Sequence, residues 1–303
     1  MFAALTVDWS ALFANSAVRT ALLMGISAAL INASLGVFTL LRGHAFAGHA
    51  LGDISSAGGA ASFLLGISAL WGFLGMAWLA ALAMGWLGLR EARERDLATG
   101  IVLGAGLGLT ALFLYLAMTT TSASGSTVTV LFGSLFAVSP GLVPPVLLLT
   151  LGTLSAITLG FRPLLLIAAD ADLARAQGIP VAILEILYLL LLGLAAAISA
   201  MTIGAILATA LLLGPAGAAL QLATRPVWAF VWAAGLATLA VVLGIFLSWQ
   251  SYYWFSGASW PVSFFIVLLT LLEYLGASLW AAQRGRKIWA AAMPPPSGCA
   301  KDC

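Results

Sequence analysis

Two side chains that can bind a metal ion lie four residues apart near the start of the chain. His49 and Asp53 belong to the segment RGHAFAGHALGDISSAGG, residues 42–59. If the segment is helical, both side chains lie on one face. An imidazole nitrogen and a carboxylate oxygen together form a ligand pair for a first-row divalent cation. In the alternative interpretation, Asp53 caps a helix that begins at Ile54 and His49 lies at the lipid headgroups.

A second chemically distinct stretch is FRPLLLIAADADLARAQGIPV, residues 161–181, which lies between two long apolar runs. A helix here would end at Gly178 and Pro180. Only 7% of all residues are charged, yet this stretch holds several of them: Asp170, Asp172 and Arg175. Such a segment is too polar for lipid, so we expect a short charged helix that protrudes from one face of a membrane and contacts another molecule.

The remaining polar candidates are isolated. Glu273 lies inside the last apolar run, where it would either couple transport to an ion or be buried protonated or beside a hydroxyl. Glu185 is expected at the membrane interface. The sequence contains no nucleophile paired with a base, no phosphate-binding glycine loop before a strand and no zinc-protease helix. We therefore expect a transport subunit without hydrolytic chemistry.

Composition places these residues in a membrane protein. The chain has 303 residues, of which 63% are hydrophobic, and its mean hydropathy is +1.12. This is far more apolar than a soluble domain, so the predicted fold is all-α, a polytopic transmembrane helical bundle of roughly eight or nine spans. The apolar runs cover residues 17–41, 54–70, 71–89, 98–118, 142–159, 182–198, 202–222, 227–248 and 261–282.

The glycines also influence how these spans are expected to pack. A broken, partly re-entrant helix is the alternative within residues 54–89, because nearby glycines favour a helix break that lines a cavity. Gly100, Gly104 and Gly108 fall on one face and predict close contact with another helix.

Basic residues predict the orientation. Counting spans places most of them on one side, which the positive-inside rule makes cytoplasmic; they are Arg90, Arg93, Arg95, Arg162, Arg175, Arg225, Arg284, Arg286 and Lys287. The predicted domains are a transmembrane permease domain, residues 1–288, and a Pro-rich disordered cytoplasmic tail, residues 289–303. Cys299 and Cys303 lie in that tail, so no disulfide framework is expected. A net charge of +2 gives no indication of nucleic acid as a partner.

Six strings follow one another along nearly the whole chain: LGVFTLLRGHAFAGHAL (35–51), ERDLATGIV (94–102), LFGSLFAVSP (131–140), DADLARAQGIPV (170–181), ILATALLLGPAGAAL (206–220) and FSGASWPV (255–262). Together they resemble the ABC-3 family of membrane permeases. In bacteria these permeases import zinc, manganese or iron(II) with a separate ATPase and a solute-binding protein.

The resemblance implies a role for the charged stretch. Residues 170–178 are similar to the coupling helix that docks into a groove on the cytoplasmic ATP-binding cassette ATPase. Asp170 opens this segment; Ala171, Leu173, Ala174 and Gly178 would pack in the groove, and Asp172 and Arg175 would make polar contacts. The resemblance further implies a homodimer in the bacterial plasma (inner) membrane with the path between two copies, delivery of the cation by an extracytoplasmic binding protein, a divalent transition metal as substrate and no permanently bound cofactor.

The proposed site departs from the family pattern. The family has aspartate and then histidine four residues on, whereas here His49 occupies the aspartate position and Asp53 the histidine position. The usual following proline-glycine is replaced by Gly58 and Gly59, which bears on the local geometry and the choice of metal. The reversed order of the pair is consistent with a subgroup that carries another cargo. Three alternatives stay open: an ion-coupled secondary transporter using Glu273, an intramembrane enzyme using the His–Asp pair, and an ABC permease of similar architecture for a non-metal substrate.

Overall fold

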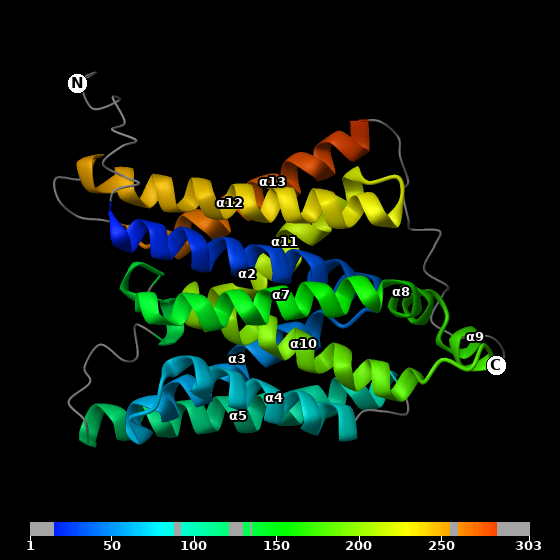
Figure 1. Ribbon diagram of the computed structural model, residues 1–303, viewed down its shortest axis with the longest axis horizontal. Helices are drawn as coiled ribbons and strands as arrows, with labels where there is room; N and C mark the ends of the chain where they lie inside the picture. Colours follow the sequence, from blue (N-terminus) through cyan, green and yellow to red (C-terminus); the bar gives the residue numbers. More distant parts are fainter. Residues whose placement is uncertain (1–14, 88–91, 121–129, 134, 255–259, 284–303) are drawn as a thin grey trace, which may run out of the picture.

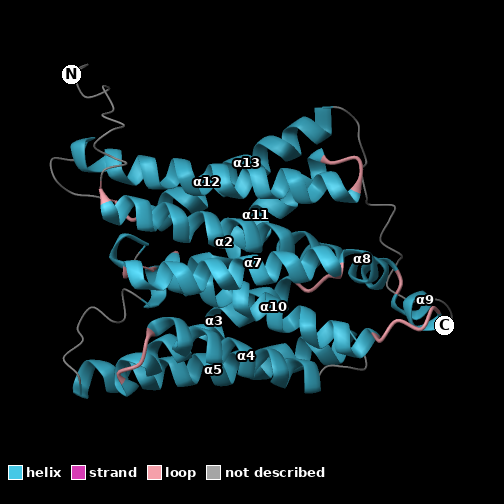
Figure 2. Cartoon of the chain, in the orientation of Figure 1, coloured by secondary structure: helices cyan, strands magenta, loops and turns pink. Residues whose placement is uncertain are grey.

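The computed structural model describes residues 15–87, 92–120, 130–133, 135–254 and 260–283, which form a helical bundle without strands in that part of the chain. Figures 1 and 2 show the long helices lying side by side. In chain order the elements are α2 (Ser16–Leu41), α3 (Ala45–Leu65), α4 (Ala69–Leu87), α5 (Ala92–Thr120), the 3₁₀ helices Leu135–Ala137 and Pro140–Leu142, α7 (Val143–Leu159), α8 (Phe161–Ala169), α9 (Ala171–Ala176), α10 (Val181–Thr202), α11 (Ala205–Leu222), α12 (Pro226–Trp254) and α13 (Val262–Gln283).

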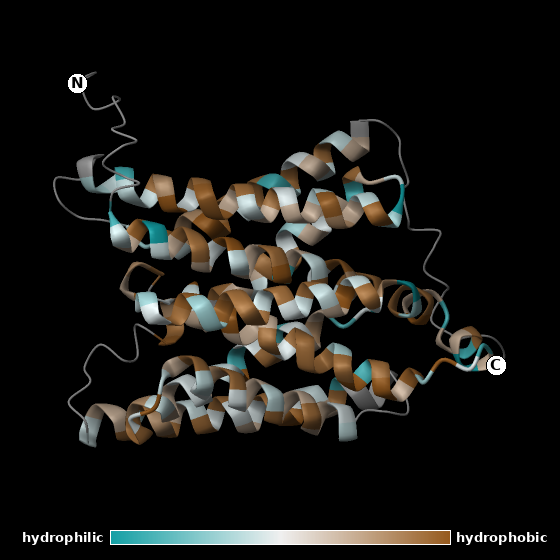
Figure 3. Cartoon of the chain, viewed as in Figure 1, coloured by the Kyte–Doolittle hydropathy of each residue, from teal (hydrophilic) through white to brown (hydrophobic). Residues whose placement is uncertain are grey.

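The predicted all-α membrane bundle is confirmed. Seven of the described helices are long and apolar enough to cross a membrane: α2, α4, α5, α7, α10, α12 and α13. Figure 3 shows apolar residues along most of their length and hydrophilic residues beside α8 and α9. The span of α7, Pro140–Leu159, includes the preceding 3₁₀ helix. Helix α11, whose apolar stretch Leu207–Leu222 is shorter, and the glycine- and serine-rich α3 complete the bundle. The predicted tail, residues 289–303, lies outside the described residues, as do Cys299 and Cys303.

Helix α2 occupies the centre of the bundle. It packs against α7, α10, α11 and α12, while α3 packs against α4, α5, α10 and α11. The buried core is made largely of alanine, leucine and isoleucine from these helices. The two helices that matter for the site, α3 and α11, are therefore held by neighbours on several sides.

Helix α3 corrects one prediction about the first half of the chain. It is continuous from Ala45 to Leu65, so the broken-helix alternative is wrong, and it begins nine residues before the expected start at Ile54. Apolarity alone placed the start too late, because His49 and Asp53 are tolerated inside the helix where neighbouring helices bury its other faces. After Leu65 the chain turns through Gly66, whose φ of 65° is left-handed.

The close approach of α3 and α4 explains one glycine of the segment. A Cβ added to Gly58 would lie 1.9 Å from the carbonyl oxygen of Gly72, and one added to Gly72 would lie 2.4 Å from that of Gly58. Neither backbone can move aside without moving its whole helix. The expected contact of Gly100, Gly104 and Gly108 is, by contrast, not found among the described residues: added Cβ atoms there meet nothing within 4 Å.

Replacing Gly58 by alanine is therefore expected to destabilise the permease. Overpacking of this kind costs about 1–3 kcal/mol, which exceeds the roughly 0.5–1 kcal/mol that alanine contributes to a helix relative to glycine. The thermal unfolding midpoint of the purified protein should fall. Gly75→Ala is the matched control, because Gly75 lies on α4 with nothing within 4 Å of an added Cβ; its midpoint should stay the same or rise. Equal midpoints for the two variants would contradict the packing argument.

Candidate functional site

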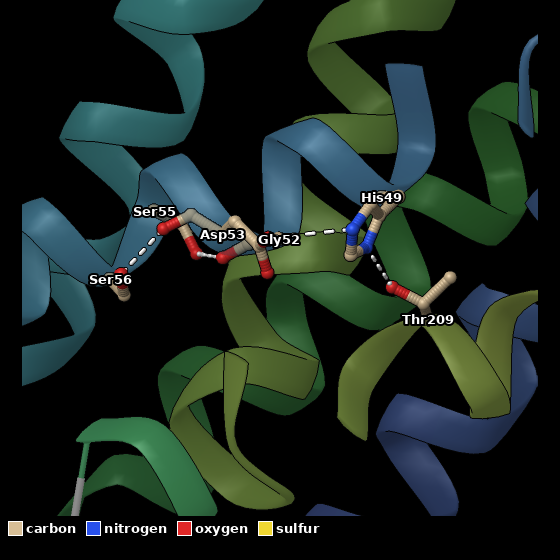
Figure 4. A network of polar contacts seen from close by, with 6 residues as sticks. All are labelled: His49, Gly52, Asp53, Ser55, Ser56 and Thr209. Atoms are coloured by element: carbon tan, nitrogen blue, oxygen red, sulfur yellow. Dashed lines mark hydrogen bonds and ion pairs between the residues drawn. The ribbon is translucent and has the colours of Figure 1, made fainter. Parts of the chain in front are cut away.

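The structure brings His49 and Asp53 together on one face of α3. Nε2 of His49 lies 3.5 Å from Oδ2 of Asp53, and the side chains are 41% and 16% exposed. Figure 4 shows the two groups projecting from successive turns of the helix. The predicted i, i+4 arrangement is therefore confirmed, and the alternative in which Asp53 caps a helix is wrong because Asp53 lies in the interior of α3.

The separation of the two groups suits a shared cation. Zinc lies about 2.0–2.1 Å from a histidine nitrogen and about 2.0–2.2 Å from a carboxylate oxygen, so a 3.5 Å spacing corresponds to an angle of roughly 110–120° at the metal. This is near the tetrahedral value. The pair could thus contribute two ligands with little movement of either side chain.

A pocket begins beside Asp53 and runs between α3 and α5. Its volume is about 300 Å³, and its lining includes Ser56 and Thr110 with apolar walls from Leu107, Ala111, Leu114, Leu131 and Ala205. The hydroxyls of Ser56 and Thr110 are buried and lie 3.0 Å apart. The pocket therefore extends from the carboxylate to a pair of hydroxyl oxygens across a helix contact.

The other nitrogen of the imidazole contacts α11. Nδ1 of His49 lies 2.8 Å from Oγ1 of Thr209, so the ring is held between two helices (Figure 4). Sequence analysis did not identify Thr209, because a single threonine in the apolar run ILATALLL has no feature that points to a residue 160 positions away.

The pair is not a complete metal site by itself. Within the described ranges no group of three or more His, Cys, Asp or Glu residues is close enough to hold a metal ion. A transition metal in a protein commonly has four or more ligands, so further ligands would have to come from water, hydroxyls or another chain.

The charged stretch forms two short helices at one end of the bundle, α8 and α9 (Figure 1). Oδ1 of Asp170 accepts hydrogen bonds from the backbone N–H groups of Asp172 and Leu173, each at 2.9 Å, and so caps α9. At the other end Gly178 has a φ of 80°, and the N–H groups of Gly178 and Ile179 donate to the carbonyls of Arg175 and Ala174. Both ends of α9 are thus determined by local hydrogen bonds; the sequence predicted the end at Gly178 but not the cap at Asp170.

One residue of α9, Ala174, is not exposed as its predicted contact with a partner would require. Leu173 is 47% exposed, whereas Ala174 is fully buried and packs with Ile167 and Val181 in a small cluster. Ala174 therefore attaches α9 to its own chain and is not available to pack in a partner's groove. The exposed Asp172 and Arg175 form an ion pair with each other, and Ala171 is partly buried.

Arg42 connects α8 to the start of α3, a role that sequence analysis did not reveal. Its NH2 group donates to the carbonyl of Leu164 on α8 at 3.3 Å, and its guanidinium lies 4.5 Å from the ring centre of Tyr188 on α10. The hydroxyl of the buried Tyr188 lies 2.7 Å from that of Thr39 on α2. An arginine at the end of an apolar run ordinarily indicates orientation only, so no pattern predicted this contact.

The isolated carboxylates do not join the pair on α3. Glu273 lies on α13, which packs against α11 and α12, and its Oε2 is buried without a hydrogen-bond partner in the part of the chain that the structure describes. Glu185 is partly buried in the first turns of α10. Neither residue forms a second ligand pair.

Comparison with known proteins gives a consistent result. The model of the ABC 3 transport family matches residues 14–279. The manganese transport system membrane protein MntC of Halalkalibacterium halodurans is 31% identical over 80% of this chain and 82% of its own length. The high-affinity zinc uptake system membrane protein ZnuB of Haemophilus influenzae is 28% identical over 75% and 86%. The solved structure of PsaBC from Streptococcus pneumoniae in complex with Fab superposes with a TM-score of 0.75 at 26% identity, covering 88% of this chain and 93% of that one.

Proposed function

The chain belongs to the ABC 3 transport family, and from this premise we propose that it is the membrane-spanning permease subunit of an ATP-binding cassette importer for divalent transition-metal cations. The observation that carries the proposal is the His49–Asp53 pair, with a nitrogen and an oxygen ligand 3.5 Å apart on an open face of α3. The pair acts as a transient binding point on the path of the cation. A transport site must bind weakly enough to release its ion, which suits an incomplete set of protein ligands.

The cargo is manganese, zinc or iron(II). The relatives include proteins named for manganese and for zinc transport. Mixed nitrogen and oxygen ligands accommodate all three metals, and intrinsic affinity follows the Irving–Williams order whatever the physiological cargo is. The metal is substrate rather than a resident cofactor.

The path of the cation lies between two copies of the chain. The His49 side chain is 41% exposed in the single chain, and an ionisable group facing lipid is costly. A second copy would cover this face and contribute a second His–Asp pair. The open Gly104 and Gly108 on the neighbouring α5 would allow a close helix contact between copies.

Energy comes from a separate cytoplasmic ATPase that docks on α9. In support, α9 lies at the end of the bundle and exposes Leu173 beside the ion pair of Asp172 and Arg175. Asp170 caps the start of α9 and Gly178 follows its end, and the partly buried Ala171 is the first residue of the helix. A soluble binding protein delivers the cation to the opposite end. The localisation is the bacterial inner membrane, with the α9 end and the C-terminus cytoplasmic.

An ion-coupled secondary transporter is the second candidate, because Glu273 carries a buried carboxylate oxygen without a partner among the described residues. Such a carrier would work without an ATPase. An ABC permease of the same architecture for a non-metal substrate is the remaining alternative and is consistent with the reversed order of the pair.

The test is cation uptake into vesicles that hold this chain with its ATPase and binding protein. Uptake of manganese, zinc and iron(II) is measured separately, with ATP and with a non-hydrolysable analogue. We expect accumulation of at least one cation with ATP only. Uptake that is independent of ATP would indicate a secondary carrier, and no uptake of any of the three metals would contradict the proposed cargo.

A further inference from the structure

The hydroxyl of Thr209 differs from most hydroxyls on the helices around it. Thr39, Thr110, Thr150 and Thr202, for example, each donate to a backbone carbonyl three or four residues earlier in their own helix. Thr209 instead makes its hydrogen bond across the helix boundary, with Nδ1 of His49 at 2.8 Å. Its side chain is partly buried in α11, so the contact is directional and shielded.

The position of this contact on the ring matters for the metal. Nδ1 faces Thr209, and Nε2 faces Asp53 at 3.5 Å. A neutral imidazole carries one proton, and the nitrogen without it is the one that binds a metal. For Nε2 to bind a cation, the ring proton must therefore reside on Nδ1, where it needs an acceptor.

A hydroxyl can meet the needs of both states of the ring. In the metal-free state Nε2–H can face the Asp53 carboxylate, 3.5 Å away, while the Thr209 hydroxyl donates to Nδ1. In the metal-bound state the lone pair of Nε2 binds the cation, the ring proton is on Nδ1, and Nδ1–H donates to the Thr209 oxygen. Between these two tautomers of the neutral ring, one proton moves from Nε2 to Nδ1 and none is released. Only a group that both donates and accepts permits this exchange.

We propose that Thr209 is the positioning residue of the metal site, holding the His49 imidazole so that Nε2 faces the cation and supporting the ring in both tautomers. This inference rests on the proposed function of His49 and Asp53. It deepens that function, because it specifies which ring nitrogen binds the metal and which helix, α11, takes part without supplying a ligand. Partners of this kind fix ring orientation, and their loss typically lowers metal affinity about 10–100-fold.

The test compares Thr209→Val with Thr209→Ser in the reconstituted importer. Valine keeps the branched shape and removes the hydroxyl, whereas serine keeps the hydroxyl. We expect Thr209→Val to raise the KM for the transported cation about 10–100-fold with little change in kcat, and Thr209→Ser to resemble the unaltered protein. An unchanged KM in Thr209→Val, or equal impairment of both variants, would overturn the inference.

A second readout does not depend on transport. The chain has only two histidines, so the ¹⁵N spectrum of ring-labelled protein contains two imidazoles, and the His44→Gln variant assigns them. Adding Zn²⁺, which is diamagnetic, should shift Nε2 of His49 to a metal-bound position and leave Nδ1 protonated. In Thr209→Val the same shift should need a higher cation concentration. A metal-bound Nδ1 in the unaltered protein would overturn the inference.

The two hypotheses fail in different ways. If His49→Ala and Asp53→Ala transport normally, the proposed site itself is wrong. If those variants lose uptake while Thr209→Val keeps an unchanged KM and an unchanged titration of the ring, only the role of Thr209 is wrong.

Discussion

Replacing His49 or Asp53 by alanine is expected to abolish cation uptake while the permease still assembles with its partners. Each substitution removes one of two ligands that lie 3.5 Å apart. Loss of an outer partner of a metal ligand typically costs about 10–100-fold, so loss of a ligand itself should cost at least about 100-fold in uptake at low cation concentration. Assembly with the ATPase should survive, because both side chains lie on α3 and neither is part of α9, the proposed docking helix.

Uptake is measured with purified complexes in vesicles, and assembly is checked by co-purification with the ATPase. His44→Ala is the matched control: it removes the other imidazole of the same segment, which packs against Tyr188 rather than Asp53, and should retain uptake. The double variant His49→Asp/Asp53→His keeps both ligand types at the same spacing and restores the order usual in the family, so it should transport better than either alanine variant. Normal uptake in both alanine variants would mean that the pair has only a structural role.

Leu173→Asp is expected to uncouple the permease from its ATPase. Leu173 is the large exposed apolar residue of α9, and truncating a central interface anchor typically costs about 2 kcal/mol or more, roughly 30-fold in affinity. A charge at this position adds a desolvation penalty. ATP-dependent uptake should therefore be lost, although the helix itself remains, because its capping contacts do not involve the leucine side chain.

The control for this prediction is a leucine of equal or greater exposure elsewhere on the chain. Leu148 on α7 is 70% exposed, so Leu173→Ala and Leu148→Ala make the same chemical change in two places. Binding of the ATPase to the purified permease is measured for both. We expect weakened binding for Leu173→Ala alone. Similar affinities would mean that α9 does not form the docking surface.

Most of the fold was accessible from the sequence because the bilayer requires long apolar helices. The runs around α2, α10, α12 and α13 matched helices closely, and Gly178 marked the C-terminal end of α9. The start of α3 was not predictable in this way. Its first turns carry His49 and Asp53, which are tolerated because neighbouring helices cover the other faces of α3, and hydropathy contains no information about those neighbours.

The candidate site was predictable where it depended on local spacing and not where it depended on tertiary contacts. His49 and Asp53 are one helical turn apart, so their proximity followed from helix geometry. Thr209 and Arg42 act through partners more than a hundred residues away, which no local pattern encodes. The burial of Ala174 within its own chain was not predictable either. A six-residue helix has too few turns for its sequence to reveal which side faces inward.

The way in which α3 is attached at its two ends has a mechanical consequence. Near one end, the three-residue turn from Arg42 to His44 is tied to α8 through the Leu164 carbonyl; towards the other, Gly58 is in backbone contact with α4. His49 lies between, about 7–8 Å along the axis from the turn, given a rise of about 1.5 Å per residue. Because α3 is continuous, His49 and Asp53 lie on one rigid segment between these two contacts. A displacement of α8 would tilt both ligands together, without altering the distance between them, and change only what they face.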